Sequence, residues 1–171
     1  MERTGAGWGA PIYVADVNTK DMELFPSTTA DGTLYFNSQR PGGAGAWDIY
    51  AARKHGAGFY PPQPLPGSVN TAIWEYNPSP SPGGLLLAFA SLDPDPAAPY
   101  SDLFFSVKRH GAYEPRIAAG ACVNTVLEEF HPTLDLARHR LLFVRSDPFT
   151  IPCVPNGDFH EVSLPEALWG Q

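Results

Sequence analysis

Val69-Asn70-Thr71, followed at a fixed spacing by Glu75 and Pro78, is one copy of a motif that decides the fold of this chain. The same residue types stand at the same spacing in three places, and the three asparagines lie 52 and then 54 residues apart. A repeat of this period covers most of the 171 residues, and it is typical of arrays built from one supersecondary unit. The other copies are Val17-Asn18-Thr19 with Glu23 and Pro26, and Val123-Asn124-Thr125 with Glu129 and Pro132.

Each copy is followed by the same succession of features. A serine or threonine follows the proline, a turn comes next, and an apolar run then leads to a serine. After a loop, an aspartate begins a second apolar run, 30, 32 or 34 residues beyond the motif asparagine. The framework therefore repeats while the loops differ in length. The first apolar runs lie at 34–36, 85–89 and 141–143, and the second runs begin at Asp48, Asp102 and Asp158.

The local signals predict short β-strands. The apolar runs are rich in Leu, Phe, Tyr and Val and are bounded by Gly, Pro, Asp and Ser. Asp31-Gly32, His55-Gly56 and His110-Gly111 predict hairpin turns, because glycine takes a positive φ at little cost. Only residues 163–168 predict a helix. Each repeat thus predicts about four antiparallel strands, and since one such sheet cannot bury both faces, neighbours must stack like the blades of a β-propeller.

The second copy resembles a known repeat. Pro78 to Ser91, together with Asp102-Leu-Phe104, is similar to the WD40-like β-propeller repeat of TolB-like proteins, and Pro26 to Ser38 with Asp48-Ile-Tyr50 is a second match. The third copy departs from the pattern at Ala137-Arg138 and at His160. The resemblance implies a non-enzymatic module that binds a protein or peptide partner through its loops or channel face, and a periplasmic or extracellular location.

We therefore expect a single all-β domain over residues 1–171, a β-propeller-type array of about three four-stranded antiparallel blades. The repeats lie at about 20–71, 72–125 and 126–164, and residues 1–19 would supply the outer strand of an incomplete or closing blade. Natural propellers typically have 4–8 blades. Three blades leave three alternatives: a homodimer that completes a six-bladed ring by exchanging strands, a section of a longer propeller, or an open arc with capped edges.

Composition and charge exclude several classes of protein. Hydrophobic residues make up 43% of the chain, which allows a sizeable core. The net charge of −7 and the absence of a basic run argue against nucleic acid as a partner. No apolar stretch approaches the ~20 residues that span a bilayer, so we expect no membrane insertion. Residues 1–10 lack the apolar segment of a secretory signal.

The repeated polar residues have a structural and a functional interpretation. A residue repeated in every unit usually serves the unit, so we expect Glu23, Glu75 and Glu129 to accept hydrogen bonds from the adjoining Asn-Thr turns. Alternatively, the three glutamates would form an acidic ring that binds a cation or a basic peptide. We expect turn and loop hydrogen bonds from Asn18, Asn70 and Asn124, and from Asp48, Asp102 and Asp158.

The variable loops carry the remaining candidates for binding. Trp47, Trp74 and Tyr100 can make aromatic contacts to a peptide or a small sugar, and Asp95 adds a loop carboxylate. The sequence contains no catalytic motif, and Cys122 and Cys153 match no metal spacing, so we predict no catalytic residue, metal or cofactor. The alternative function is that of a propeller enzyme or carbohydrate-binding protein, glycosidase-like or lyase-like, with a carboxylate site at the channel mouth.

Overall fold

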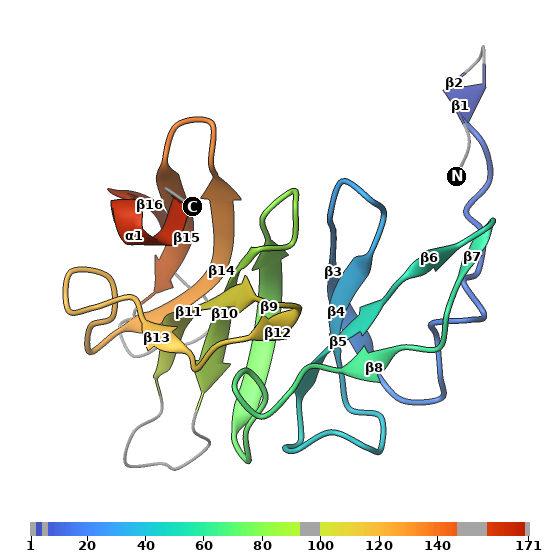
Figure 1. Ribbon diagram of the computed structural model, residues 1–171, viewed down its shortest axis with the longest axis horizontal. Coiled ribbons are helices and arrows are strands. Elements are labelled where there is room, and N and C mark those ends of the chain that lie inside the picture. The colour runs from blue at the N-terminus through green and yellow to red at the C-terminus, as the bar shows by residue number, and fades with distance from the viewer. Residues whose placement is uncertain (1–2, 5–6, 93–99, 147–156, 170–171) are drawn as a thin grey trace.

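The computed structural model describes residues 3–4, 7–92, 100–146 and 157–169. Within these residues the fold is all-β, with antiparallel sheets and one short helix. Three sheets lie side by side (Figure 1), and one of the sheets is curled like half of a barrel. No helix in the described part of the chain is long and apolar enough to cross a membrane.

Each sheet begins after one copy of the motif. Sheet 1 has the strand order β3 (Glu23–Thr28), β4 (Leu34–Ser38), β5 (Asp48–Ala52) and β8 (Gln63–Pro64). Sheet 2 contains β9 (Trp74–Pro80), β10 (Leu86–Leu92) and β11 (Ser101–Arg109), with β12 (Ala112–Tyr113) and β13 (Ile117–Ala118) both paired to β11. Sheet 3 contains β14 (Glu128–Asp135), β15 (Arg140–Ser146) and β16 (Gly157–Ser163).

The smaller elements follow the turn signals of the sequence. The predicted His55-Gly56 turn joins β6 (Lys54–His55) to β7 (Gly58–Phe59), with Gly56 at φ +57°. The N-terminal residues form the two-residue strands β1 (Arg3–Thr4) and β2 (Gly7–Trp8), which project away from the sheets (Figure 1). The helix α1 (Glu166–Trp169) is shorter than the predicted 163–168 because it begins only after Pro165, where the chain leaves β16.

A buried phenylalanine occupies the same register in all three sheets. Phe36, Phe89 and Phe143 are each at most 3% exposed. Each is paired across the ladder with an aromatic side chain of the next strand, and the ring centroids lie 6.1, 6.0 and 5.5 Å apart. The repeat in the sequence is therefore a repeat of packing as well. The partners are Tyr50, Phe104 and His160.

The first strand of every sheet carries a β-bulge at the motif proline. The ladder to the second strand shifts register there in all three sheets. The residues before the prolines, Phe25, Asn77 and His131, have φ between +50° and +53°. A positive φ is uncommon for residues other than glycine and costs about 1–3 kcal/mol each time. Because the bulge recurs in all three copies despite this cost, it is a regular feature of the repeat. The motif in the sequence includes the three prolines, but the sequence did not predict the bulge beside them.

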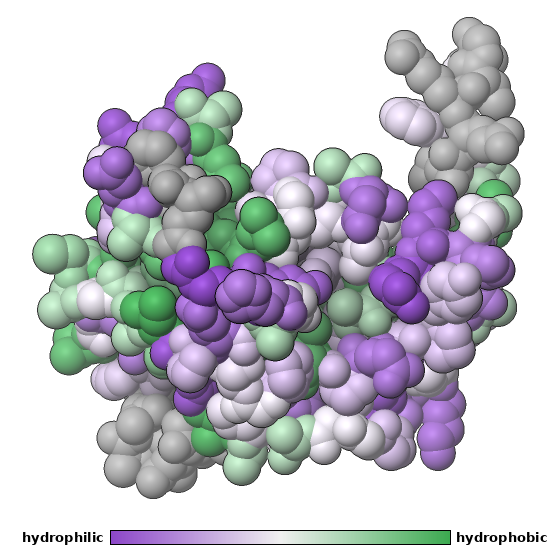
Figure 2. Space-filling view, in the orientation of Figure 1, coloured by the Kyte–Doolittle hydropathy of each residue, from purple (hydrophilic) through white to green (hydrophobic). Residues whose placement is uncertain are grey.

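Neighbouring sheets pack against each other through apolar faces and a few polar links. One cluster joins Tyr35 and Ile49 of sheet 1 to Leu87 and Phe89 of sheet 2. A second cluster joins β10 and β11 to β15. In the view of Figure 2, hydrophobic surface gathers over sheets 2 and 3, whereas the part around sheet 1 is mainly hydrophilic. The uncovered apolar surface on this face therefore lies mostly toward the sheet 3 side.

The motif asparagine joins each sheet to the chain that follows it. Asn70 is fully buried, and its Oδ1 accepts a hydrogen bond from the Ile49 amide at 2.8 Å. Its Nδ2 donates to the carbonyl oxygens of Ile49 and Leu65 at 2.9 and 3.0 Å. Asn124 clamps the main chain of Leu103 in the same way, at 2.9 and 3.0 Å. The side-chain amide thus replaces a strand partner near the beginning of β5 and of β11.

Sheet 3 differs from the expected four-stranded unit. In the described part of the chain it has three strands, and no outer strand pairs with β16. The N-terminal segment lies against sheet 1, where the Phe59 amide donates to Asp16 Oδ2 at 3.0 Å and Val17 packs beside Phe36. Sheet 1 and sheet 3 stand at opposite ends of the array (Figure 1).

We expect Asn70→Ala to destabilise the protein by about 2–4 kcal/mol, because it leaves the buried amide of Ile49 without an acceptor and removes a donor from the carbonyl oxygens of Ile49 and Leu65. Urea unfolding measures the change. The control is Gln63→Ala, which removes an exposed amide from the neighbouring strand and should change the free energy of unfolding by no more than about 0.5 kcal/mol. Equal effects of the two substitutions would contradict the clamp.

Candidate functional site

The three repeated glutamates are each held by the threonine four residues before them. The Thr71 amide and hydroxyl donate to Glu75 at 2.9 and 2.6 Å. Thr125 donates to Glu129 in the same way at 3.1 and 2.6 Å, and Thr19 donates to Glu23 at 3.1 and 2.7 Å. Each carboxylate therefore closes the turn of its own sheet.

An arginine completes each of these clusters. Arg40, Arg116 and Arg145 lie 2.9, 3.0 and 2.8 Å from the respective glutamates. Each guanidinium also lies over an aromatic ring of the repeated pair, 4.6 to 5.5 Å from the ring centroid. Such a cation–π contact adds to the ion pair. No repeated spacing marks these arginines in the sequence, since one follows β4, one precedes β13 and one lies within β15.

The third arginine corrects the sequence alignment of the repeats. Arg145 pairs with Asp158 across the ladder, as Ser38 pairs with Asp48 and Ser91 with Asp102. Ser146, the serine that ends the third apolar run, is one position later and pairs with Gly157. Arg145 thus occupies the serine position and reaches Glu129 directly.

The electrostatics of the first two clusters differ because their burial differs. Burial raises the pKa of Glu75, which is fully buried, even though hydrogen bonds from Thr71 and the charge of Arg116 oppose it. For Glu23, burial raises the pKa less than the hydrogen bonds from Thr19 and Ser38 and the charge of Arg40 lower it, so its pKa falls below the ordinary value. Among the described residues, no group of three or more His, Cys, Asp or Glu side chains could hold a metal ion.

The repeated aspartates serve the loops to different degrees. Asp48 is buried, and it accepts hydrogen bonds from the amides of Ala44 and Gly45 at 2.9 and 3.1 Å. A Cβ at Gly43 would collide with the Asp48 carboxylate, and one at Gly45 would collide with the Ile73 carbonyl oxygen. The glycines of this loop are therefore needed for close approach, and the loop that carries Trp47 is fixed. Asp102 is half-buried, which raises its pKa, and Asp158 is exposed.

Two of the predicted aromatic residues meet in one pocket. Trp47 precedes β5 in sheet 1, and Trp74 begins β9 in sheet 2. The Glu75 amide donates to the Trp47 carbonyl oxygen at 2.9 Å, which ties the two sheets together at this point. The pocket has a volume of about 210 Å³ and is lined by Leu24, Phe25, Asn37, Trp47, Trp74, Tyr76 and Leu92.

The aromatic pocket contains one unsatisfied polar group. Asn37 is 1% exposed, and its Oδ1 is buried without a hydrogen-bond partner. A buried acceptor without a donor costs about 1–3 kcal/mol, and such an atom in a folded protein calls for an explanation. Tyr76 stays a neutral phenol, since burial raises its pKa to about 12. The pocket therefore has a mainly apolar lining, and the Asn37 Oδ1 atom is buried beside it.

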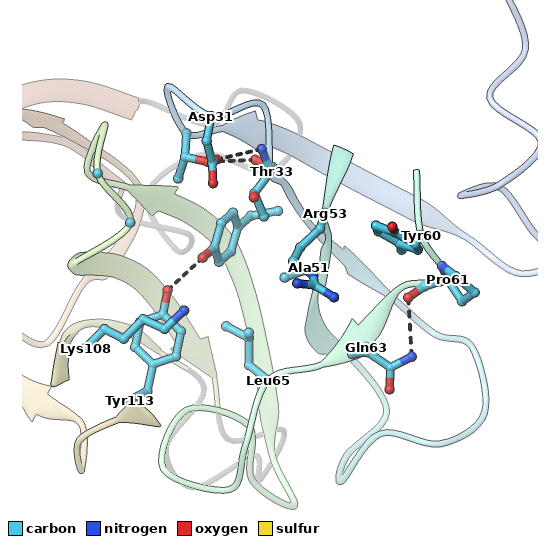
Figure 3. Close-up of a pocket in the computed structure, with 14 residues that line it drawn as sticks. Asp31, Thr33, Ala51, Arg53, Tyr60, Pro61, Gln63, Leu65, Lys108 and Tyr113 are labelled. Atoms are coloured by element: carbon cyan, nitrogen blue, oxygen red, sulfur yellow. Dashed lines mark hydrogen bonds between the residues drawn. The ribbon is translucent and has the colours of Figure 1, made fainter. Parts of the chain in front are cut away.

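A larger groove lies between sheets 1 and 2 at the opposite ends of the strands (Figure 3). It has a volume of about 580 Å³, and its tyrosines Tyr35 and Tyr113 share a hydrogen bond of 3.0 Å. Arg53 and Lys108 lie over tyrosine rings at 5.3 and 5.4 Å and form no ion pair among the described residues. Most polar groups that line the groove are thus already engaged with each other.

The first strands of the three sheets, β3, β9 and β14, form a third hollow from equivalent residues. Its volume is about 330 Å³. Phe25 of sheet 1 meets His131 of sheet 3 edge to face, with ring centroids 5.0 Å apart, and burial lowers the pKa of His131. The bulge residues of the first strands therefore converge here. The lining residues are Phe25, Pro26, Ser27, Asn77, Pro78, Ser79, His131, Pro132 and Thr133.

The remaining predicted residues do not join these sites. Tyr100 precedes β11, is half-buried and is not among the residues that line the aromatic pocket. Asp95 and Cys153 lie outside the described residues. Cys122 is exposed and its thiol is free. Of the loop residues singled out in the sequence, Trp47 and Trp74 are the two that the structure brings together.

Substitution of Glu23 and Glu75 by glutamine should change stability with opposite pH dependence. The pKa of Glu23 is lowered by folding, so its contribution is present above about pH 4.5 and is lost as the pH falls. The pKa of Glu75 is raised by folding, so its contribution is present below about pH 4.5 and is lost as the pH rises. Urea unfolding between about pH 3.5 and 7 measures both differences from the unsubstituted protein. Differences with the same slope would contradict the burial argument.

A scan against protein-family models finds no match to this chain. A search of the curated proteins finds no significant match either. The resemblance to the WD40-like repeat therefore rests on the residues quoted above, and function has to be argued from the pockets and their chemistry.

Proposed function

We propose that the chain is a β-propeller-type module that binds a protein partner through an extended peptide segment, and that one apolar side chain of this segment enters the pocket between Trp47 and Trp74. The observation that carries the proposal is the pocket itself: Trp47 and Trp74, from neighbouring sheets, line a hollow of about 210 Å³ whose other walls are aromatic and aliphatic apart from Asn37. A peptide offers an apolar side chain that such a hollow accepts.

The arrangement of the sheets supports the propeller-type array. Three antiparallel sheets follow each other along the chain, pack face to face and place their first strands next to each other. Polar links also join the first strands: Ser27 Oγ donates to the Pro78 carbonyl oxygen at 2.6 Å, and the Leu134 amide donates to Ser79 Oγ at 3.2 Å. Radial packing of short sheets, with the first strands innermost, is the geometry of propeller blades.

The pocket has the features of a peptide anchor site. Its tryptophans come from different sheets, and the main-chain bond from Glu75 to Trp47 fixes their relative position before a ligand arrives. Tryptophan is enriched among the residues that carry most of the energy at protein interfaces, and a rigid site loses little entropy on binding. With a volume of about 210 Å³, the pocket is too small for a drug-sized ligand, which needs roughly 300 Å³ or more, but suits one side chain.

The same features favour a peptide over a sugar and over catalysis. A sugar presents many hydroxyl groups, and this lining offers few polar groups to bond them. Catalysis on a glycoside needs two available carboxylic groups. Each of the three repeated glutamates is bound to a threonine and an arginine, and Asp48 is bound to its own loop.

The test is a selection of random linear peptides displayed on phage against the full chain, with the Trp74→Ala variant as counter-selection. We expect enriched peptides that share one aromatic or large aliphatic residue. Isothermal titration with a synthetic copy should show binding that Trp74→Ala and Trp47→Ala each weaken at least about tenfold, because the anchor loses an aromatic wall.

The matched control is Tyr60→Ala, which removes an aromatic ring from the larger groove at the other end of the strands. It should leave the affinity unchanged. If Tyr60→Ala weakened binding while Trp74→Ala did not, the larger groove would be the binding site. If no peptide bound, and a glycan array gave a ligand whose binding depends on Trp74, the partner class proposed here would be wrong.

A further inference from the structure

Sheets 1 and 2 show how an outer edge of this array is closed. The amide of Leu65 donates to the carbonyl oxygen of Ile49 at 2.9 Å, and Asn70 then clamps both main-chain groups of Ile49. In sheet 2, Ala119 donates to Leu103 at 2.9 Å, and Asn124 clamps Leu103. In both cases the closing segment runs beside the third strand and ends in the Val-Asn turn of the next motif copy.

The N-terminal segment has the same local structure as these closing segments. Val17 and Asn18 donate to the Val14 carbonyl oxygen at 3.1 and 3.0 Å. The corresponding amides of the later copies donate to Pro66 at 2.8 and 3.1 Å and to Gly120 at 2.9 and 2.8 Å. Residues 14–18 are therefore folded into the turn that presents the asparagine, as in the other two copies.

What the first copy lacks is a strand to clamp. The side chain of Asn18 has no hydrogen-bond partner among the described residues, whereas those of Asn70 and Asn124 each make at least two hydrogen bonds. Tyr13 occupies the position of Leu65, and Ile12 precedes it; both are 71% exposed. Residues 12–18 thus have the conformation of a closing segment, but no described strand at this end of the array pairs with them.

The matching edge is β16. Counted from the repeat aspartates, Phe159 occupies the position of Ile49 and Leu103. Ile49 and Leu103 are 0% and 1% exposed, whereas Phe159 is 85% exposed. No described strand pairs with the outer side of β16. Because β16 and the N-terminal segment lie at opposite ends of the array, this segment does not reach β16 of its own copy (Figure 1). The matching turn and exposed residues favour the N-terminal segment of a second copy as the strand that covers β16.

We propose that two copies of this chain associate head to tail, with residues 11–18 of each copy added as the outer strand of sheet 3 in the other. The Asn18 amide then clamps the main chain of Phe159, the Tyr13 amide donates to the Phe159 carbonyl oxygen, and Ile12 lies opposite His160. Two such contacts close a ring in which no edge of this kind stays open. The ring has six sheets, within the usual 4–8 of propellers. It does not depend on the aromatic pocket.

Light scattering coupled to gel filtration over a concentration series tests the association. The full chain is expected at the mass of two copies. Asn18→Ala should raise the dissociation constant at least about tenfold, because two hydrogen bonds are lost per contact, without changing the far-UV circular dichroism. The control Val126→Ala trims an apolar residue that is 76% exposed and lies outside the proposed contact, and should leave the dimer intact. A monomer at every concentration, or a dimer unaffected by Asn18→Ala, would overturn the proposal.

A disulfide cross-link tests whether residues 11–18 pair with β16 of another copy, and it tests the register of that pairing. In sheets 1 and 2 the strand residues Tyr50 and Phe104 pair with Pro64 and Ala118, and the same register places Ile12 opposite His160. Ile12→Cys and His160→Cys are combined in a chain whose two cysteines are replaced by serine. Oxidation should give a covalent dimer on a non-reducing gel, and a mixture of the two single-cysteine chains should give the same product. A cross-link confined to one chain would contradict the exchange between copies.

Discussion

The structure depends on a buried joint between one sheet and the next. In this joint an asparagine amide closes the strand behind it. The threonine that directly follows the asparagine binds the glutamate four residues later, at the start of the strand ahead. Buried polar groups of this kind are favourable only when every member is satisfied, and a half-satisfied set would be worse than an apolar one. The requirement explains why asparagine, threonine and glutamate recur together at fixed spacing. It also explains why each glutamate has acquired an arginine, although from a different part of its sheet.

The same joint determines where the aromatic pocket forms. The turn after sheet 1 leads directly into β9, and Trp74 at the start of β9 therefore lies beside the loop that ends at Trp47. That loop is itself tied down by Asp48 and by glycines that have no room for a side chain. The pocket thus lies between two sheets that the main-chain hydrogen bond from Glu75 to Trp47 joins at this point. A pocket made in this way needs no element beyond the repeat and the loops it carries.

The sequence predicted the strands, turns and repeated phenylalanines because these depend on local pattern: apolar runs of strand length, glycines at hairpin turns and a constant spacing. It also singled out Trp47 and Trp74, since loop aromatics stand out from a repeating framework. It could not predict Arg116 or Arg145 as partners of the glutamates, because their position in the chain is not repeated and only folding brings them to Glu75 and Glu129. The sequence also could not predict that the Asn37 Oδ1 atom is buried without a hydrogen-bond donor, because this depends on which groups surround the atom after folding.

The third repeat shows that the residues at the start of a sheet's third strand are buried only where a closing segment lies beside that strand. Asp48 and Ile49 are buried, and the chain that follows them, from β8 to Asn70, lies along their strand. Asp158 and Phe159 occupy the same positions in β16, pair with β15 in the same manner, and are exposed. The difference between them is the closing segment, which sheet 3 lacks among the described residues. In this array, β16 therefore has the sequence of a covered strand but an exposed position among the described residues. A closing segment like the one that ends at Asn70 is what would bury it.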